Sequence, residues 1–530
     1  MRNLIIIVFF FLSSSNYIYA QWATDPNNNL IVGYGLDPHI CSDSAGGCYI
    51  TYDYNSTSYP RWLALERLDK YGYKPWGTLK RILGELPGQS KAEITENGEG
   101  GVIISYEDRD ETVGWTARIR VQKVDSNGNF LWGPTGVKVT LDEINQGSQK
   151  IVNDGEGGAV VIWVNTIAEY KVNRISSDGQ RMWGDSGIVL GVNSSYDPAI
   201  LARTSNNNYV SSTERNIIKY FDENGNVFYT DSAVFGLGNI ISDGIGGIVL
   251  SGRVWTGIIP KLVAQRKDSL GNNLWQEPYV EIADSLGLGS FRVGANNRII
   301  NYAWLGTYNG QTDRPCFQAV NLEGNLVYQN KILLGEYPSG TTFIGIISSY
   351  YNNTIFSWSV SGEVNSIFAQ MYDTLGNKIW NENGIIVSHP RMTYQQYSTD
   401  GSGGFIVVGL INNFTVVAQQ VNKYGKLGEI ITNISSEENK VIENELTLIQ
   451  NFPNPFNSSS TIQYIVPADE DILIELFNTL GEKVKTLVNR FHTQGVYTVN
   501  LSSNELSSGI YLYKLQTETK SLTKKLIIIK

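Results

Sequence analysis

The sequence predicts an all-β protein: an eight-bladed β-propeller, with seven blades as the alternative, closed by its N-terminal strand and followed by a small Ig-like β-sandwich. Three observations predict this architecture. One short phrase recurs at intervals of about 50 residues, apolar and β-branched runs of strand length separate its copies, and these runs lack the spacing of an amphipathic helix. A composition with 53 Gly and only 17% charged residues is typical of tightly turned β-structure.

The recurring phrase is an Asp or Asn, a Gly, and an aromatic residue four positions after the Gly. Its clearest copy is Asp268–Trp275, which contains Gly271. The other copies with an aromatic are Gly72/Trp76, Gly128/Trp132, Gly179/Trp183, Gly225/Tyr229, Gly324/Tyr328 and Gly376/Trp380. An eighth copy at Gly425 lacks the aromatic. We expect each aromatic to pack between neighbouring blades, where a buried ring contributes roughly 2 to 3 kcal/mol.

A second mark precedes each phrase and predicts a hairpin turn. It is Asp154–Gly158 in the third copy, and Asn replaces Gly in several others, as expected because Asn tolerates the left-handed backbone of tight turns. The third copy then reads as four short strands. They are Gln149–Val152, Ala159–Val164, Tyr170–Ile175 and Gly187–Leu190. Four such strands in each repeat predict one propeller blade.

The two ends of the repeat array are complementary. The eighth copy stops near Glu429 without its aromatic and fourth strand, whereas Trp22 and the run Leu30–Val32 match what is missing. We therefore expect the N-terminal strand to complete the last blade, which removes the open sheet edges.

The first 20 residues have the pattern of a secretory signal peptide. A charge at Arg2 precedes the apolar run Leu4–Leu12, and cleavage is predicted between Ala20 and Gln21. No later run of about 18 apolar residues predicts a transmembrane segment. The formal net charge of −10 argues against nucleic acid as a partner. The predicted location is therefore outside the cell.

The chain divides into a signal peptide (1–20), a propeller (21–431), an acidic linker (432–445) and a C-terminal β-sandwich (446–530). The strands predicted for the sandwich are Ile472–Phe477, Val496–Leu501, Ile510–Leu515 and Leu526–Ile529. Residues of five ordered motifs stand out in this last domain. They are Asn454, Pro455, Phe456, Asn457, Gly481, Gly509, Tyr511, Lys524 and Lys525.

With these motifs, the last domain resembles the type A sorting domain of the type IX secretion system of Bacteroidetes-like bacteria. The resemblance implies that the outer-membrane secretion machinery recognises this domain. It also implies that a sortase-like cysteine peptidase cuts ahead of the domain, for which we favour the acidic linker, and that the protein is then released or attached to surface lipopolysaccharide.

Residues 21–430 resemble uncharacterised propeller repeats that accompany such sorting domains, and no activity follows from that likeness. The Gly-to-Trp phrase is also similar to the tryptophan-docking motif of eight-bladed quinoprotein dehydrogenases. The Asp lies three residues before the Gly, as at Asp125 and Gly128, one residue short of that family's spacing, and the family's vicinal cysteines are absent. We interpret this as shared packing and predict no cofactor.

Few residues have the chemistry of a site, and we predict no catalytic, cofactor or metal residue. Cys41 and Cys48 flank a hairpin turn and are candidates for a disulfide, since exported proteins meet an oxidising environment. His39 and His389 lie at opposite ends of the array, where ring closure would bring them closer and leave a metal or general-base role open. The acidic group of Glu107, Asp108 and Asp110 is placed in a loop between strands, where it is solvated or lines one face.

Two functions remain open. The favoured one is a non-enzymatic binding or scaffold protein for glycan or protein, and the alternative is an extracellular hydrolase, lyase or oxidoreductase with a site in the central channel. An enzyme would show convergent titratable residues, whereas a binder would show exposed aromatics. The candidate ligand-facing aromatics are Tyr52, Tyr54, Trp115 and Trp255, although each also suits packing.

Overall fold

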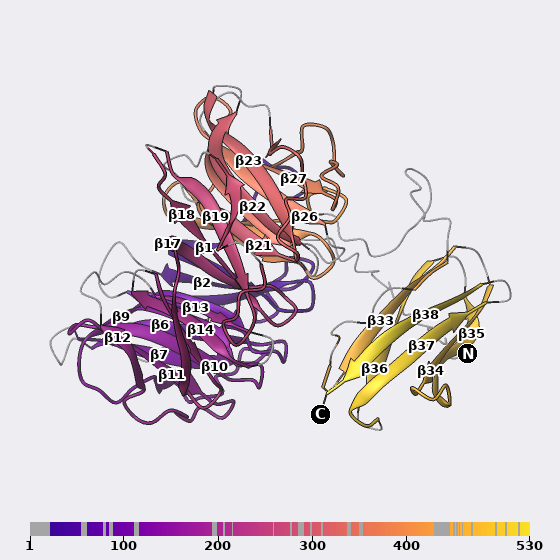
Figure 1. The fold of residues 1–530 in the computed structure, drawn as a ribbon, viewed down its shortest axis with the longest axis horizontal. Coiled ribbons are helices and arrows are strands. Elements are labelled where there is room, and N and C mark those ends of the chain that lie inside the picture. Colours follow the sequence, from indigo (N-terminus) through magenta and orange to yellow (C-terminus); the bar gives the residue numbers. More distant parts are fainter. Residues whose placement is uncertain are drawn as a thin grey trace, which may run out of the picture. The chain divides into compact units, whose positions relative to one another are not determined.

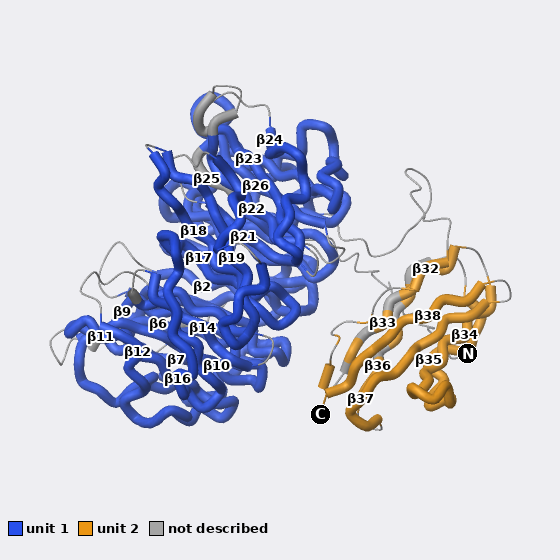
Figure 2. Tube along the Cα trace, viewed as in Figure 1, with its two compact units in different colours: residues 1–430 blue, residues 431–530 orange. Residues whose placement is uncertain are grey.

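The computed structural model contains only strands and turns in the residues that it describes. These are 22–54, 61–77, 81–83, 88–110, 116–192, 199–204, 207–214, 216–257, 259–275, 278–284, 291–296, 299–308, 311–335, 341–348, 353–428, 446–448, 451, 454, 456–457, 459–467, 470–492, 495–503, 506–517 and 520–529. The chain forms two compact units, residues 1–430 and residues 431–530, coloured separately in Figure 2. The predicted linker 432–445 lies outside the described residues.

Unit 1 forms strands β1 to β31 in its described residues (Figure 1). They are β1 (Leu30–Ser42), β2 (Cys48–Tyr54), β3 (Trp62–Leu68), β4 (Arg81–Leu83), β5 (Gln89–Glu96), β6 (Val102–Asp110), β7 (Thr116–Val124), β8 (Val137–Lys138), β9 (Gln146–Asn153), β10 (Ala159–Asn165), β11 (Glu169–Ile175), β12 (Ile188–Val192), β13 (Ile200–Arg203), β14 (Tyr209–Glu214), β15 (Ile217–Phe221), β16 (Val227–Ser232), β17 (Gly236–Ser242), β18 (Ile248–Val254), β19 (Lys261–Lys267), β20 (Val280–Ala283), β21 (Arg292–Ala295), β22 (Ile299–Tyr308), β23 (Gln311–Asn321), β24 (Ile332–Leu333), β25 (Thr341–Ser348), β26 (Thr354–Val360), β27 (Ser366–Tyr372), β28 (Ile385–Ser388), β29 (Thr393–Thr399), β30 (Phe405–Ile411) and β31 (Thr415–Val421).

Consecutive strands of unit 1 pair antiparallel to make four-stranded sheets. Six of the sheets contain β5–β8, β9–β12, β13–β16, β17–β20, β21–β24 and β25–β28. The remaining strands make one seven-stranded sheet in the order β29-β30-β31-β1-β2-β3-β4. A series of four-stranded antiparallel sheets is the architecture of a β-propeller. The all-β class and the four strands predicted for the third repeat, which match β9 to β12, are confirmed.

The N-terminal strand β1 belongs to two groups of strands. Its residues Leu30 to Tyr34 pair with β31, and its residues Gly35 to Ser42 pair with β2. Completion of the last repeat by the N-terminal strand is therefore confirmed. Since different residues of β1 pair with β31 and with β2, this one strand belongs to both the last and the first group of strands.

The sheets of unit 1 form a closed circle. The first strands of successive sheets contact one another in turn, from β1 through β5, β9, β13, β17, β21 and β25 to β29, and β29 contacts β1. The apolar core lies between neighbouring sheets. For example, Ile119 and Val121 of β7 form one buried cluster with Val161 and Trp163 of β10.

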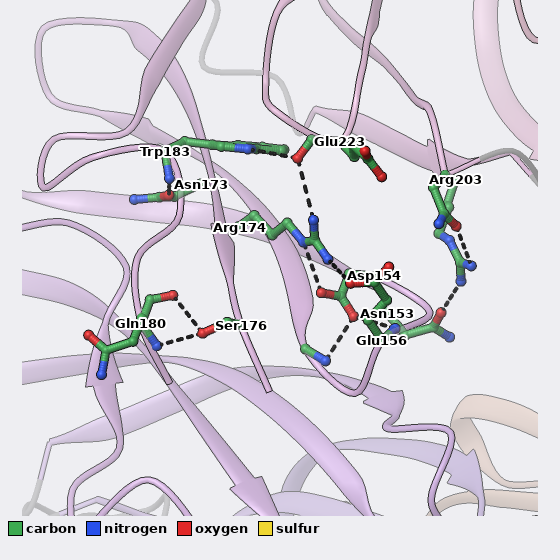
Figure 3. A network of polar contacts seen from close by, with 12 residues as sticks. Asn153, Asp154, Glu156, Asn173, Arg174, Ser176, Gln180, Trp183, Arg203 and Glu223 are labelled. Carbon is green, nitrogen blue, oxygen red and sulfur yellow. Dashed lines mark hydrogen bonds and ion pairs between the residues drawn. The ribbon is translucent and has the colours of Figure 1, made fainter. Parts of the chain in front are cut away.

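The repeated aromatic joins each sheet to the next one. The indole N–H of Trp183 donates to the carbonyl oxygen of Glu223 at 3.1 Å, in the turn before the next aromatic (Figure 3). The other indoles make the equivalent bond at 3.0 to 3.1 Å: Trp22 to Lys70, Trp76 to Ser126, Trp132 to Ser177, Trp275 to Leu322 and Trp380 to Lys423. Trp22 thus supplies the aromatic that the eighth copy lacks.

The repeated glycine makes room for that aromatic. Gly179 has φ +88°, and a Cβ there would stand 3.0 Å from the Trp132 ring. Any L side chain at this position would meet both an unfavourable backbone region and the ring. The spacing of the phrase is therefore explained by sheet-to-sheet packing, as expected from the sequence.

A buried ion pair strengthens the same junction in some repeats. Asp154 accepts the backbone N–H groups of Glu156 and Gly158 with Oδ1, while its Oδ2 pairs with Arg174 Nε at 2.9 Å. Arg174 also donates to the Glu223 carbonyl that receives the Trp183 indole (Figure 3). The pairs Asp43/Arg67 and Asp243/Arg266 repeat this arrangement.

Unit 2 forms strands β32 (Thr447–Leu448), β33 (Ser459–Val466), β34 (Glu470–Phe477), β35 (Lys483–His492), β36 (Gly495–Ser502), β37 (Gly509–Gln516) and β38 (Ser521–Ile528). They make two sheets, β32-β33-β36 and β35-β34-β37-β38, which share one buried apolar cluster. Three of the predicted strands fall within β34, β36 and β37, and Leu526–Ile529 overlaps the end of β38 and extends one residue beyond it. Strands β32, β33 and β35 were not predicted, and β35 is mostly exposed, so it lacks an apolar pattern.

Candidate functional site

Four neighbouring first strands share a left-handed residue, which lies near the start of β5, β9 and β29 and, in β1, near the start of the part that pairs with β2. The residues are Tyr394 in β29, Asp37 in β1, Lys91 in β5 and Ser148 in β9, with φ of 51°, 51°, 52° and 52°. Each lies at or beside a break in strand register, and each side chain is exposed. Backbone strain of this kind costs roughly 1 to 3 kcal/mol per residue and clusters at functional sites, and β-bulges re-aim side chains.

Two buried carboxylates occupy one position of the repeat, six residues after the last glycine of the hairpin turn. They are Asp53 in β2, 6% exposed, and Glu107 in β6, 1% exposed. After the other turns that end in a glycine, the same position holds Val164 in β10, Arg253 in β18 and Leu410 in β30. Since an apolar residue satisfies the fold there and a buried charge is costly, the carboxylates point to a function.

Two cations hold the Glu107 carboxylate. Its Oε1 accepts from Lys91 Nζ at 3.0 Å, and its Oε2 accepts from Arg109 Nη2 at 3.0 Å. Gly147 of β9 makes room for this group, because a Cβ there would stand 2.9 Å from Oε1. The Nε of Arg109 is buried and has no hydrogen-bond partner among the described residues.

These side chains line a cleft of about 200 Å³ between the sheets β5–β8 and β9–β12. The first sheet contributes Lys91, Glu107 and Arg109, and the exposed Asn145 and Ser148 lie on the side of the second sheet. Two cations and one carboxylate give the lining a net charge of +1, whereas the whole chain has a formal net charge of −10. The cleft is therefore a local positive site on an acidic protein.

Asp53 belongs to a second group of titratable residues, where β1 and β2 meet β5. Burial raises the pKa of Asp53 to about 7, and the charge of Asp37 adds to this increase. Burial lowers the pKa of His39, but the contact with Asp37, 3.5 Å from Nε2 to Oδ1, and the charge of Glu93 raise it above its usual value. The contact with His39 in turn lowers the pKa of Asp37. Asp53 therefore changes charge near neutral pH.

The two histidines singled out from the sequence have separate partners. His39 lies beside Asp37 in β1, and His389 Nδ1 lies 3.0 Å from Ser366 Oγ. No group of three His, Cys, Asp or Glu side chains in the described part of the chain is placed to hold a metal ion.

The prediction that Glu107, Asp108 and Asp110 lie in a loop is wrong. All three belong to strand β6, in which Asp108 pairs with Arg120 at 2.6 Å. The run of acidic residues favoured a loop prediction. Pairing with basic residues on the neighbouring strand, however, allows such a run to form part of a sheet. Glu107 does line one face, as the cleft shows.

The candidate aromatics separate into core and surface. Tyr52 is fully buried and Tyr54 is partly buried, so Tyr52 is not a ligand-facing residue. Trp255 is 61% exposed, and Trp115 lies outside the described residues. The sequence analysis did not single out the exposed Tyr34 and Tyr394.

The predicted bridge between Cys41 and Cys48 is not formed in the structure. Both thiols are free. Cys41 pairs with Tyr49, whereas Cys48 pairs with Ser42. Because neighbouring residues of a strand point to opposite faces, this register directs the two thiols to opposite sides of the sheet, and each packs in a different apolar cluster.

The sorting-motif residues tie the ends of unit 2 together. Asn454 Oδ1 accepts the backbone N–H of Ile527 at 2.8 Å, and its Nδ2 donates to the carbonyl of Lys525 at 3.1 Å. Phe456 is buried and pairs with β38 through its backbone. The Asn457 carbonyl accepts from the Ser503 hydroxyl. Pro455 lies outside the described residues.

The other motif residues shape turns and the surface of unit 2. Gly481 adopts φ +81° in the turn between β34 and β35, and Gly509 begins β37. Tyr511 is 9% exposed and donates from its hydroxyl to the Ser507 carbonyl. Lys524 and Lys525 lie exposed on β38.

The predicted signal peptide and its cleavage site, Ala20 and Gln21, lie outside the described residues. Within the residues that the structure does describe, no helix has the length and apolar character needed to cross a membrane.

Residues 450–529 match the family model described as the secretion system C-terminal sorting domain. This confirms the resemblance drawn from the sequence motifs of the last domain. A domain of this kind directs export by the type IX secretion system, so the chain is secreted or located at the cell surface. No curated protein matches the chain.

Several solved structures are similar to the chain at low identity. The β-propeller domain of the Trilobed protease from Pyrococcus furiosus is 9% identical, covers 76% of this chain and 99% of its own, and has a TM-score of 0.39. BamB from Moraxella catarrhalis is 12% identical, with 71% and 96% covered and a TM-score of 0.36. A polysaccharide lyase of family PL25, an ulvan lyase bound to a sugar, is 9% identical, with 76% and 97% covered and a TM-score of 0.39.

Proposed function

We propose that the chain is an exported, non-enzymatic binding protein. Residues 21–431 form an eight-bladed β-propeller, residues 432–445 a linker, and residues 446–530 an Ig-like sorting domain. The propeller binds a glycan or protein ligand at the cleft around Glu107. The family match of residues 450–529 supports export, and the cleft supports binding.

The circle of first strands supports the count of eight blades. Six four-stranded sheets account for β5 to β28, and the seven-stranded sheet holds two more groups that meet at β1. The strands β1, β5, β9, β13, β17, β21, β25 and β29 then form one closed series of contacts. A ring of seven would leave one of these groups without a place.

The pairing of charges in the cleft favours binding over catalysis. Glu107 is bracketed by Lys91 and Arg109. Glu93 on the neighbouring part of β5 pairs with Lys150. Both carboxylate oxygens of Glu107 already accept a hydrogen bond from a cation, so this side chain holds the two donors in place. The cleft therefore offers hydrogen-bond donors and a fixed charge.

An extracellular enzyme is the second candidate, and Asp53 is the observation that favours it. Its carboxyl is buried, its pKa is raised to about 7, and its Oδ1 has no hydrogen-bond partner among the described residues. A carboxyl that titrates near the working pH suits general acid and base catalysis. Asp37 lies close enough to both groups that its charge raises the pKa of His39 and the pKa of Asp53.

Glycan-array screening and turnover assays of the full chain without its signal peptide test the two functions. We expect binding to a defined set of glycans or proteins and no product from polysaccharide substrates. Turnover that is abolished by Asp53→Asn would replace the binding function with the enzymatic one. If the chain shows neither binding nor turnover over a broad panel, that result would favour a scaffold role.

The processing steps are part of the same proposal. We expect the signal peptide to be cut after Ala20 and the sorting peptidase to cut within residues 432–445. Intact mass of the protein recovered from the surface or medium of a host with a type IX system measures both ends. A mature protein that retains residues 446–530 would contradict the second cut.

A further inference from the structure

We propose that the cleft around Glu107 binds an acidic polysaccharide through a carboxylate or sulfate group, which Lys91 and Arg109 hold. This inference rests on the proposed binding function and names its ligand class. The ligand group would add a second negative charge to a cluster that now has two cations and one carboxylate.

The exposure of the three charges favours approach by an anion. The side chains of Lys91 and Arg109 are 58% and 37% exposed, whereas that of Glu107 is 2% exposed. A ligand that enters from solvent therefore meets the cations first and the carboxylate last. Glu107 fixes both cations in position, so less side-chain entropy is lost when the ligand binds.

Both cations retain hydrogen-bond donors for a ligand. Among the described residues, the Lys91 ammonium donates one hydrogen bond, to Glu107, which uses one of its three donors. Arg109 uses one Nη2 donor for Glu107, which leaves other Nη donors of its five for a ligand, whereas its Nε is buried. A planar guanidinium beside an ammonium suits a carboxylate or sulfate, whose oxygens accept several bonds at once.

The acidic groups around the cleft are themselves paired. Glu93 binds Lys150, and Glu143 at the rim binds Arg118 at 2.6 Å. Asp37 faces Lys91 across neighbouring strands, and the charge of Lys91 contributes to its lowered pKa. Each of these three carboxylates has a cationic partner or neighbour of its own, whereas Asp53, which accepts a backbone hydrogen bond from Lys91, adds negative charge near the cleft as pH rises through its pKa of about 7.

The rest of the lining favours a sugar over a peptide. Asn145, Ser148 and Thr166 are exposed polar side chains at the cleft. Amide and hydroxyl groups match the hydroxyl groups of a sugar ring, whereas a peptide side chain would gain little, since Ala117 and Val164 are the only apolar side chains among the lining residues. An acidic polymer would also be repelled by the acidic body elsewhere, which confines its binding to this cleft.

Calorimetric titration of the full chain tests the inference with four probes: hexagalacturonate, a sulfated galactan hexamer, the neutral cellohexaose and hexaglutamate. We expect one or both acidic sugars to bind, and cellohexaose and hexaglutamate to bind at least tenfold more weakly. Lys91→Gln and Arg109→Gln should each weaken the acidic sugar by about tenfold or more, since a charged hydrogen bond is lost. Raising the salt concentration should weaken it as well.

Lys378→Gln is the matched control. This lysine is paired with Glu382 on another sheet, so its replacement should leave the affinity unchanged. We expect Lys91→Gln to fold, because Lys91 is 58% exposed and Arg109 still pairs with Glu107, and thermal unfolding of each variant checks this.

Three results would overturn the inference. Equal affinity for cellohexaose would show that the charge is not recognised, equal affinity for hexaglutamate would assign the cleft to acidic peptides, and unchanged affinity in Lys91→Gln and Arg109→Gln would place the ligand elsewhere. In each of these cases the binding function itself survives. Turnover of the acidic sugars would instead overturn the binding function.

Discussion

The indole N–H of Trp22 donates to the carbonyl oxygen of Lys70 at 3.1 Å, and its ring lies against Gly72. This contact closes the circle of sheets with a residue from the start of the folded chain. It has the same geometry as the contacts between consecutive repeats, such as Trp183 with Glu223. Ring closure therefore uses the same contact as the five other junctions that contain a tryptophan, whereas Tyr229 and Tyr328 pack against Gly271 and Gly376 without an indole hydrogen bond.

Trp22→Ala should lower the free energy of unfolding by about 3 to 5 kcal/mol, because a buried aromatic and its hydrogen bond are lost. Urea unfolding followed by tryptophan fluorescence measures this. Trp255→Ala is the control, since that side chain is 61% exposed and should change stability by less than about 0.5 kcal/mol. Equal effects of the two variants would contradict the closing role of Trp22.

Gly179→Ala and Gly184→Ala form a matched pair. Both glycines have left-handed backbones, with φ of +88° and +82°, but only the Cβ at 179 would press on Trp132. Gly184→Ala should therefore cost about 1 kcal/mol of backbone strain, whereas Gly179→Ala should cost at least about 1 kcal/mol more from the clash. The melting temperatures of the two variants report the difference, and identical values would refute the docking role of the glycine.

Arg174→Gln should destabilise the protein by about 3 kcal/mol, because the buried Asp154 loses its cation. Glu156→Gln removes the other partner of Arg174, which is 60% exposed, and should cost no more than about 1 kcal/mol. Chemical denaturation of both variants tests the contrast drawn in Figure 3. A larger loss for Glu156→Gln would contradict it.

Asp53→Asn should make the protein more stable at pH 8 and bring no gain at pH 4. In the unfolded chain the carboxyl ionises near pH 3.8, and in the fold near pH 7. Between these values the folded state holds a proton that the unfolded state has lost, so wild-type stability falls as pH rises and levels off above about 7.

Thermal unfolding of wild type and Asp53→Asn from pH 4 to pH 8 measures this difference, which we expect to reach about 2 to 4 kcal/mol. The raised pKa of His39 acts in the same direction, because the stabilising charge is lost as pH rises through that pKa. Since both proteins keep His39, their difference isolates Asp53. A difference that does not depend on pH would show that Asp53 is ionised throughout.

Asn454→Ala should loosen the last strand of unit 2 and reduce export. The side chain makes two bonds to the backbone of β38, at Lys525 and Ile527. Their loss should cost roughly 1 to 3 kcal/mol. In a host with a type IX system, the amount of protein accessible to a protease added outside the cells measures export, and the exposed Asn489 replaced by Ala is the control. Full export of Asn454→Ala would contradict the prediction.

The repeated contacts could be predicted from the sequence because each leaves a periodic mark. Gly271 and Trp275 recur at fixed spacing, and the N-terminal Trp22 fits the gap in the last copy. Strand β35 left no such mark, because its exposed residues do not alternate. The disulfide prediction failed for a related reason: a hairpin turn shows that two strands are close, but register decides which faces their thiols point to.

Glu107 was named from the sequence as a residue that could line one face, but Asp53 and the cleft were not predicted, because they lie where the repeats differ. Asp53 and Glu107 replace residues that are apolar at Val164 and Leu410. Aligning the copies on their turn glycines would have revealed these two carboxylates. The left-handed residue Lys91 could not be found in this way, because a β-bulge shifts the count of residues and depends on the strand beside it.

The closed circle has a consequence for how the protein responds to proteolytic cleavage. Because each sheet is gripped by a neighbour on either side, and β1 is hydrogen-bonded to both β2 and β31, cutting one surface loop would turn the chain into two fragments without opening the ring. The two fragments would stay folded together through the non-covalent contacts between their sheets. The same property would let the chain be given new ends at a connection between two sheets.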